Sequence, residues 1–142
     1  MYYMGINIWP VLAAAVATMV IGFLWYSPAL FAKPWTRLMG YDLNDKARMA
    51  EMQRGAAKMY ALTFVATLVS AAMLAKIIAV TTVNSPLYGV KIGLAIWLGF
   101  VTTVQLTNAL FNKKPAKLYL IDTGYQLVCY AVMGAIIAMW NR

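Results

Sequence analysis

Four long apolar runs, separated by short polar connections, dominate the sequence. They cover approximately residues 6–26, 56–80, 87–110 and 118–140. Each run has roughly 20 residues or more, and a helix of that length, rising about 1.5 Å per residue, crosses a hydrocarbon core about 30 Å thick. The pattern therefore predicts an all-α protein, a four-span transmembrane helical bundle, with a single integral membrane domain over residues 1–142.

The connection between the first two runs, residues 27–55, is the longest. Pro28 and Pro34 interrupt helical structure in its first part. From Lys46 onward, apolar residues recur at helical spacing opposite charged ones, which predicts an amphipathic helix. This helix either lies on the membrane surface or extends the second span toward the cytoplasm, and Gly55 weakens the continuous version.

Lysine and arginine residues predict the orientation of the spans. Six lie within residues 27–58 and three within 112–117, whereas residues 81–86 contain none. Because basic connections stay in the cytoplasm, we expect both of these there and both termini on the outer side. The net charge of +8 is then explained by topology and by contact with anionic lipids on the cytoplasmic side, and we expect no nucleic-acid partner.

Composition supports a membrane protein and argues against most enzyme classes. Of the 142 residues, 63% are hydrophobic and 11% are charged, whereas soluble domains have about 45–50% apolar and about 25% charged residues. Histidine is absent and Cys129 is the single cysteine, so the commonest general base and metal ligand are missing and no internal disulfide can form. We therefore expect no catalytic residues, no metal and no cofactor.

Small residues within the spans indicate close helix packing. Gly89 and Gly93 form a GxxxG pair in the third run, and Gly134 lies in the fourth. Glycines at this spacing let two helices approach closely in a membrane. The small-residue stripes offer more packing surface than one bundle needs, so we expect a homo-oligomer or a partner within a larger membrane complex.

Polar residues in several runs fall at a similar depth, near the cytoplasmic ends of the spans. The predicted members of this polar layer are Tyr26, Tyr60, Thr63, Gln105, Asn108, Asp122, Tyr125 and Gln126. Two interpretations stay open. The polar groups could join helices by hydrogen bonds, with Asp122 paired to Lys113 or Lys117. Alternatively, they could form a pocket centred on Asp122 for a small molecule, lipid or ion.

The segment around the end of the first run combines aromatic and basic residues. Trp25 and Trp35 flank two prolines, and Lys33 and Arg37 lie beside them. Such residues are typical of an aromatic belt at the membrane surface, and together they could also bind a lipid headgroup or another anion. Residues 22–34 also resemble residues 99–115 weakly, which indicates either a parallel repeat of two helical hairpins or a chance recurrence.

The residues Gly-Phe-Leu-Trp-Tyr-Ser-Pro-Ala-Leu-Phe-Ala-Lys-Pro-Trp at 22–35 carry a family resemblance. Ala-Lys-Met-Tyr at 57–60, Gln-Leu-Thr-Asn at 105–108 and Asp-Thr-Gly-Tyr at 122–125 support it. The chain resembles a small bacterial integral membrane family catalogued as domain of unknown function seventeen sixty-one, which often has Gly where this chain has Ala32. The resemblance implies a four-span protein of the bacterial cytoplasmic membrane and brings no known activity.

These patterns favour one function and leave a second open. The first is a binding or transport module that uses the polar layer around Asp122. The second is a structural or accessory subunit that packs against itself or a larger membrane complex. A membrane enzyme is the least favoured class, because no spacing in the sequence assembles a nucleophile with a base or a cluster of metal ligands.

Overall fold

The computed structural model describes residues 2–3, 6–27, 29–40, 45–81 and 85–140. Four helical segments in it are long and apolar enough to cross a membrane, namely Ile8–Trp25, Arg54–Thr81, Pro86–Phe111 and Ala116–Trp140. These bounds lie within about two residues of the four runs read from the sequence. The prediction of an all-α fold with four candidate spans is therefore confirmed.

The elements follow one another in a simple order. They are β1 (Tyr2–Tyr3), β2 (Ile6–Asn7), α1 (Ile8–Trp25), α2 (Ala32–Leu38), α3 (Lys46–Thr81), α4 (Pro86–Ile96), the π-helix η1 (Trp97–Val101), α5 (Thr102–Phe111) and α6 (Ala116–Trp140). The two short strands pair antiparallel, with Tyr3 opposite Ile6. The sequence pattern predicted neither these strands, nor the short helix α2, nor the π-helical turn within the third span.

Local chemistry explains where the first helices begin. The side chain of Asn7 accepts a hydrogen bond from the Trp9 amide over 3.2 Å and caps α1. Pro10 and Pro34 lie in the first turns of α1 and α2, where a missing amide hydrogen removes no helical bond.

Helix α3 runs without interruption from Lys46 to Thr81. It thus extends the second span, as one of the two sequence interpretations proposed, and does not form a separate surface helix. Gly55 lies in its interior, and a Cβ atom built there would meet nothing within 4 Å. Residues 41–44 and the side chains of Met49 and Met52, which the amphipathic pattern used, lie outside the described part of the chain.

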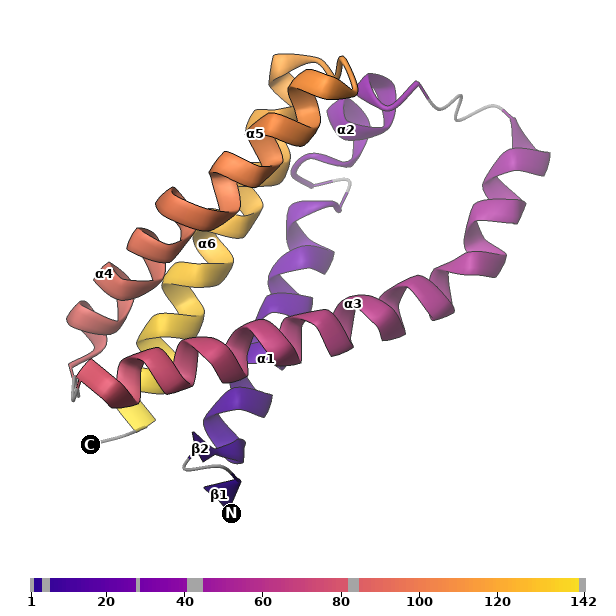
Figure 1. The fold of residues 1–142 in the computed structure, drawn as a ribbon. Helices are drawn as coiled ribbons and strands as arrows, with labels where there is room; N and C mark the ends of the chain where they lie inside the picture. Colours follow the sequence, from indigo (N-terminus) through magenta and orange to yellow (C-terminus); the bar gives the residue numbers. More distant parts are fainter. Residues whose placement is uncertain (1, 4–5, 28, 41–44, 82–84, 141–142) are drawn as a thin grey trace.

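Helix α6 occupies the centre of the bundle (Figure 1). It contacts α1 on one flank and α4 with α5 on the other. The segment carrying α2 and the turn between α5 and α6 lie at one end of the molecule, whereas α1 begins and α6 finishes near the other (Figure 1). The basic residues of α2 and those of the turn between α5 and α6 therefore lie at one end, in keeping with the predicted orientation.

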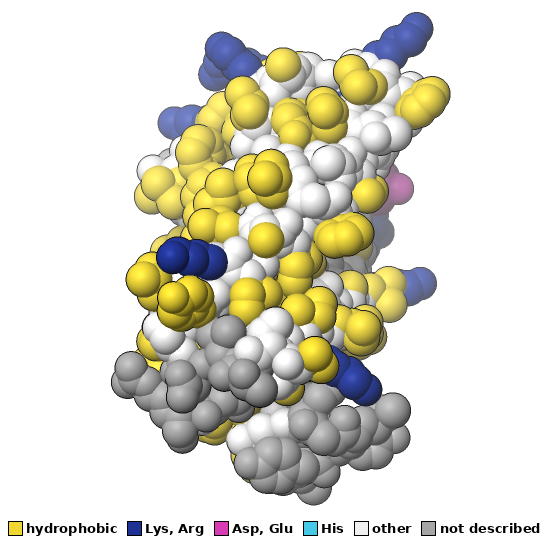
Figure 2. All heavy atoms as spheres, turned by 60° about the vertical axis from the view of Figure 1, so that its left-hand side comes forward, with side chains coloured by type: hydrophobic (Ala, Val, Ile, Leu, Met, Phe, Trp, Pro, Cys, Tyr) yellow, Lys and Arg dark blue, Asp and Glu magenta, His cyan; other side chains and the backbone are white. Residues whose placement is uncertain are grey.

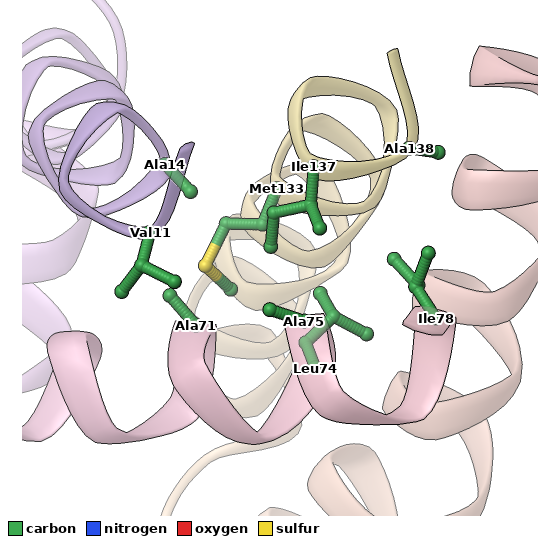
Figure 3. Packing of buried hydrophobic residues seen from close by; sticks show 9 residues of the cluster. All are labelled: Val11, Ala14, Ala71, Leu74, Ala75, Ile78, Met133, Ile137 and Ala138. Carbon is green, nitrogen blue, oxygen red and sulfur yellow. The ribbon is translucent and has the colours of Figure 1, made fainter. Parts of the chain in front are cut away.

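The hydrophobic core lies where α3 crosses α1 and α6. Figure 3 shows most of its side chains pointing into the space between these three helices, whereas Ala138 points away from α1 and α3, toward α4. The cluster consists of Val11, Ala14, Ala71, Leu74, Ala75, Ile78, Met133, Ile137 and Ala138. All four of its α3 members come from the second half of that helix, so the first half of α3 diverges from the bundle (Figure 1).

Glycines bring α4 and α6 into direct backbone contact. A Cβ atom added to Gly89 would lie 2.1 Å from the carbonyl oxygen of Gly134, and one added to Gly134 would lie 2.0 Å from that of Gly89. A Cβ atom on Gly93 would lie 2.1 Å from the carbonyl oxygen of Tyr130. The GxxxG pair is therefore used within the chain, and this glycine face is covered by α6 and unavailable to a second protein.

The outer surface suits contact with lipid. Figure 2 shows hydrophobic side chains across the face that includes α4 and α5, with Lys and Arg gathered at its upper end and a few lower down. Large apolar residues such as Leu98, Phe100 and Val104 are mostly exposed there. Such a surface is stable in hydrocarbon and would associate in water.

Candidate functional site

The segment after α1 is fastened to α6 by two side chains that are adjacent in sequence. The Tyr26 hydroxyl donates to the Asp122 carboxylate over 2.7 Å, and the Trp25 indole nitrogen donates to the Ile121 carbonyl oxygen over 3.0 Å. Both bonds join residues 96 positions apart. They place the end of α1 against the first two turns of α6.

Aromatic rings complete this attachment. The Tyr26 ring makes edge-to-face contacts with Trp35, at 5.7 Å between centroids, and with Tyr125, at 5.4 Å. The ring of Trp25 lies 4.8 Å from that of Phe31. A Cβ atom on Gly124 would lie 3.3 Å from the indole of Trp25, a tight contact that glycine avoids. We call Trp25, Tyr26, Phe31, Trp35 and Asp122 the elbow cluster.

Asp122 is paired with Tyr26, and not with Lys113 or Lys117 as the sequence analysis proposed for a packing role. Its carboxylate accepts the Tyr26 hydrogen bond. Lys113 and Lys117 are both exposed, and no ion pair between either lysine and Asp122 occurs among the side chains that the structure describes. The carboxylate is thus held by a neutral hydroxyl donor, in the angle between α1 and α6.

A cleft of about 440 Å³ lies beside the elbow cluster, between α3 on one side and η1 with α5 on the other, and α6 forms its floor. Its walls come from four of the helical elements and from η1. The lining residues are Thr18, Thr63, Ala66, Thr67, Ser70, Phe100, Val101, Val104, Gln105, Tyr125, Gln126, Cys129, Tyr130 and Met133. Asp122 is absent from this lining, and so is every other charged residue.

Gln105 is the most informative residue of the cleft. Its Oε1 atom is buried and has no hydrogen-bond partner in the described part of the chain. An unused buried acceptor costs about 1–3 kcal/mol, so such groups call for an explanation. On the floor of the cleft, the Gln126 amide also makes no hydrogen bond to the residues described.

The hydroxyl groups of the cleft are mostly satisfied by their own helices. Thr18, Thr63 and Thr67 donate to the carbonyl oxygens of Ala15, Met59 and Thr63 at 2.7–2.8 Å. Tyr125 donates to the Thr18 carbonyl oxygen over 3.1 Å. The glutamine amides therefore stand out as groups with unused hydrogen-bonding capacity.

The π-helical turn shapes one wall of the cleft. Phe100 and Val101 belong to η1 and line it. Hydrogen bonds to α6 hold this turn in place. The Trp97 indole nitrogen donates to the Thr123 carbonyl oxygen over 2.9 Å, and the Thr123 hydroxyl donates to the Thr102 hydroxyl over 2.8 Å. Single π-turns within α-helices often occur at functional sites.

The predicted polar layer is divided into two neighbouring groups. Asp122 and Tyr26 belong to the elbow cluster, whereas Thr63, Gln105 and Gln126 line the cleft, and Tyr125 contacts both. Two candidates lie elsewhere. Tyr60 is half exposed and packs its ring against Phe23, and Asn108 is exposed and bonds to Asn112 one turn further along.

The predicted lipid or anion site is only partly assembled. Trp25 and Trp35 are engaged in the elbow cluster, whereas Lys33 and Arg37 are exposed one turn apart on α2. Neither basic side chain forms an ion pair with the described residues. Within the same part of the chain, no group of three or more Cys, Asp or Glu side chains is placed to hold a metal ion.

Sequence reasoning omitted several cleft residues from the site. Thr18, Thr67, Ser70 and Tyr130 all line it. A signal for two of them exists, because Thr67 and Ser70 follow Thr63 along one stripe of the second span. Nothing in the local pattern of Thr18 or Tyr130 distinguishes them from packing residues.

The fold and this site define a class, a multi-pass α-helical membrane protein with four spans and a cleft lined by uncharged residues. Within that class, the chain belongs to the family described as "Protein of unknown function (DUF1761)", whose model matches residues 9–138. The match covers nearly the whole chain and confirms the resemblance read from the sequence. Comparison with curated proteins and with solved structures gave no match.

Proposed function

We propose that this protein is a binding module of the bacterial cytoplasmic membrane that holds a small, mainly apolar molecule in the cleft between α3 and α5. In this proposal the basic connections face the cytoplasm, in keeping with the positive-inside rule. The observation that carries it is the Gln105 amide, whose buried oxygen is unpaired in the wall of that cleft. The oxygen is covered by neighbouring atoms, so a molecule in the cleft would reach it after a rotation of the Gln105 side chain.

The size and lining of the cleft support this function. Small-molecule sites generally occupy about 300–1,000 Å³ and combine apolar walls with a few polar groups. The cleft has a volume of about 440 Å³ and sets two glutamine amides among Ala66, Val104 and Met133. A site between helices is also a common position for a ligand in a helical bundle.

Filling the cleft tests the proposal. Ala66 lines it, and Ala79 is another exposed alanine of α3 outside it. The protein would be purified in mild detergent, and molecules extracted from it would be quantified per chain by mass spectrometry. We expect a retained molecule in the wild type, a loss of about tenfold in Ala66→Trp and no loss in Ala79→Trp. Equal retention in all three proteins would contradict the proposal.

A second candidate function, that of a self-associating or accessory subunit, is favoured by a specific feature of α3. Residues 57–63 are all exposed, so this stretch contacts little of its own bundle on any side. Leu62, Val65 and Val69 continue an exposed apolar stripe along the outer face of the helix. Another membrane helix could pack along this stripe.

Cysteine cross-linking in native membranes tests this second candidate. Val65 on α3 and Val20 on α1 are both about half exposed, and each would be changed to Cys in a Cys129→Ser background. If α3 forms a self-association surface, oxidation should give disulfide-linked dimers with Val65→Cys and few with Val20→Cys. Monomers alone, or equal dimer yields from both positions, would count against α3 as the interface.

A further inference from the structure

The chemistry of the cleft points to a particular class of ligand. We propose that the cleft takes an uncharged amphiphile from the bilayer, with a hydroxyl or amide head and one apolar chain, and discriminates against anionic lipids. This inference rests on the proposed binding function and goes further by naming the ligand class. It is argued from the absence of charge, the position of the amides and the direction in which the cleft opens.

No charged side chain lines the cleft. Asp122, the charged residue nearest in sequence to its floor, is engaged by Tyr26 outside the lining. The basic residues Lys33, Lys113 and Lys117 are exposed at the end of the molecule and are likewise not part of the lining. A charged head within the cleft would be desolvated without a counter-ion, which costs several kcal/mol, so a neutral head is favoured.

Two amides line the cleft, one in its wall and one in its floor, in the half of the bundle that carries the basic connections. Gln105 lies six residues before the last residue of α5, about 9 Å along the helix, and Gln126 lies ten residues after the first residue of α6, about 15 Å along it. An amide both donates and accepts hydrogen bonds. A hydroxyl or amide head, which does the same, matches these groups, whereas a purely accepting head would leave the Gln105 oxygen unpaired.

The cleft opens toward the surrounding hydrocarbon. Thr63 and Ala66 on α3 line one rim and are exposed, and Phe100 and Val104 line the other rim and are exposed as well. Phe100 lies eleven residues before the last residue of α5, roughly 16 Å along the span, so the opening reaches well into the membrane core. A ligand can therefore enter sideways from the bilayer and keep its apolar chain in contact with lipid.

A matched pair of probes tests the ligand class. 1-Oleoylglycerol and oleoyl lysophosphatidic acid share the same chain and glycerol, and differ by one phosphate group. Each would be added at equal concentration to the detergent-purified protein, and the bound fraction would be measured by native mass spectrometry. We expect 1-oleoylglycerol to bind about tenfold more tightly than the phosphate-bearing probe.

Substitutions of the two glutamines test whether their amides bind the head of 1-oleoylglycerol. Gln105→Leu should lower binding of 1-oleoylglycerol about tenfold, because the hydroxyl head loses its partner. Asn108→Leu is the matched control, since Asn108 is a polar amide on the same helix but lies outside the lining. Gln126→Leu provides the same test from the floor of the cleft if Gln105→Leu does not fold. Equal loss in the control, or no loss in either cleft variant, would overturn the inference.

The outcomes separate this inference from the binding function on which it rests. Tighter binding of lysophosphatidic acid that is lost in Ala66→Trp would refute the neutral ligand class and keep the binding function. Binding of neither probe, together with unchanged extracts from Ala66→Trp, would refute both. A dimer that dissociates in Ala66→Trp would show that a second copy fills the cleft, which also refutes the inference.

Discussion

The two sides of α6 differ in how they are packed. On one side Gly89, Gly93 and Gly134 bring α4 and α6 into backbone contact. On the other side α3 diverges, and a cleft lined by Gln105 and Gln126 separates it from α5. Van der Waals packing between small residues holds membrane helices together, because lipid offers no hydrophobic drive to association. The glycine contact therefore packs one side of α6 without a gap, whereas the cleft on the other side is where we propose that a ligand binds.

The elbow cluster is a second packing contact of α6, with the end of α1, although it contains Asp122, the residue on which the sequence analysis centred the predicted pocket. Asp122 bonds to Tyr26, and the neighbouring Trp25 bonds to α6. The carboxylate therefore positions α1, and we expect changes in it to alter stability more than ligand binding. The following predictions test this distinction. Substitutions in the glycine contact or the elbow cluster should lower the free energy of unfolding and leave ligand binding in the cleft unchanged.

The largest effect is expected at the glycine contact. In Gly134→Val the new side chain would overlap the Gly89 carbonyl group, because even a Cβ atom would lie 2.0 Å from its oxygen. Backbone groups cannot move aside as a flexible side chain can, so we expect a loss of about 3 kcal/mol or more in the free energy of unfolding. Unfolding in mixed detergent micelles measures it. A loss below about 1 kcal/mol would show that this side is not closely packed.

A smaller effect is expected at the elbow cluster. Tyr26→Phe removes the hydroxyl that binds Asp122 and keeps the ring contacts with Trp35 and Tyr125. Hydrogen bonds to charged groups contribute about 1.5–3 kcal/mol, so we expect a loss of about 2 kcal/mol in unfolding free energy. Tyr88→Phe is the control, because Tyr88 is mostly exposed. If Tyr26→Phe instead removed the bound ligand without changing stability, Asp122 would belong to the ligand site.

The smallest effect, and one of opposite sign, is expected on the open side. Gly55 lies within α3 with open space around it, since a Cβ atom there would meet nothing within 4 Å. Gly55→Ala should raise the stability of the helix by about 0.5–1 kcal/mol, because alanine loses less backbone entropy on folding. Circular dichroism during thermal unfolding checks this. A destabilised variant would indicate that α3 bends at Gly55 in the membrane.

Much of the fold was predictable because a membrane span is defined by residues that are consecutive in the sequence. A helix that crosses hydrocarbon needs about 20 consecutive apolar residues whatever its neighbours are, and the observed bounds of the spans follow from this rule. The predicted use of Gly89, Gly93 and Gly134 in helix packing is also seen. The short helix α2 was missed because Pro28 and Pro34 indicate a break and do not exclude a helix that starts between them.

The candidate site was predicted less completely. Helical spacing grouped Gln105, Tyr125, Gln126 and Thr63 in one predicted polar layer, and all four line the cleft. Depth alone does not specify which helices are neighbours, so Asn108 and Tyr60 were included although they lie elsewhere. The role of Thr18 depends on Tyr125, 107 positions away, whose hydroxyl binds its carbonyl oxygen. No local pattern records such a contact.

The sequence by itself determined that this is a four-span membrane protein, where each span begins and ends, and on which connections its basic residues lie. The length of an apolar run and the positions of charge and proline are local quantities, and the bilayer acts on them directly. Only the tertiary structure decided that the glycine face is used within the chain, that Tyr26 holds Asp122, and that α3 diverges to leave a cleft. These features depend on which helix faces which, and side-chain packing between distant segments settles that choice.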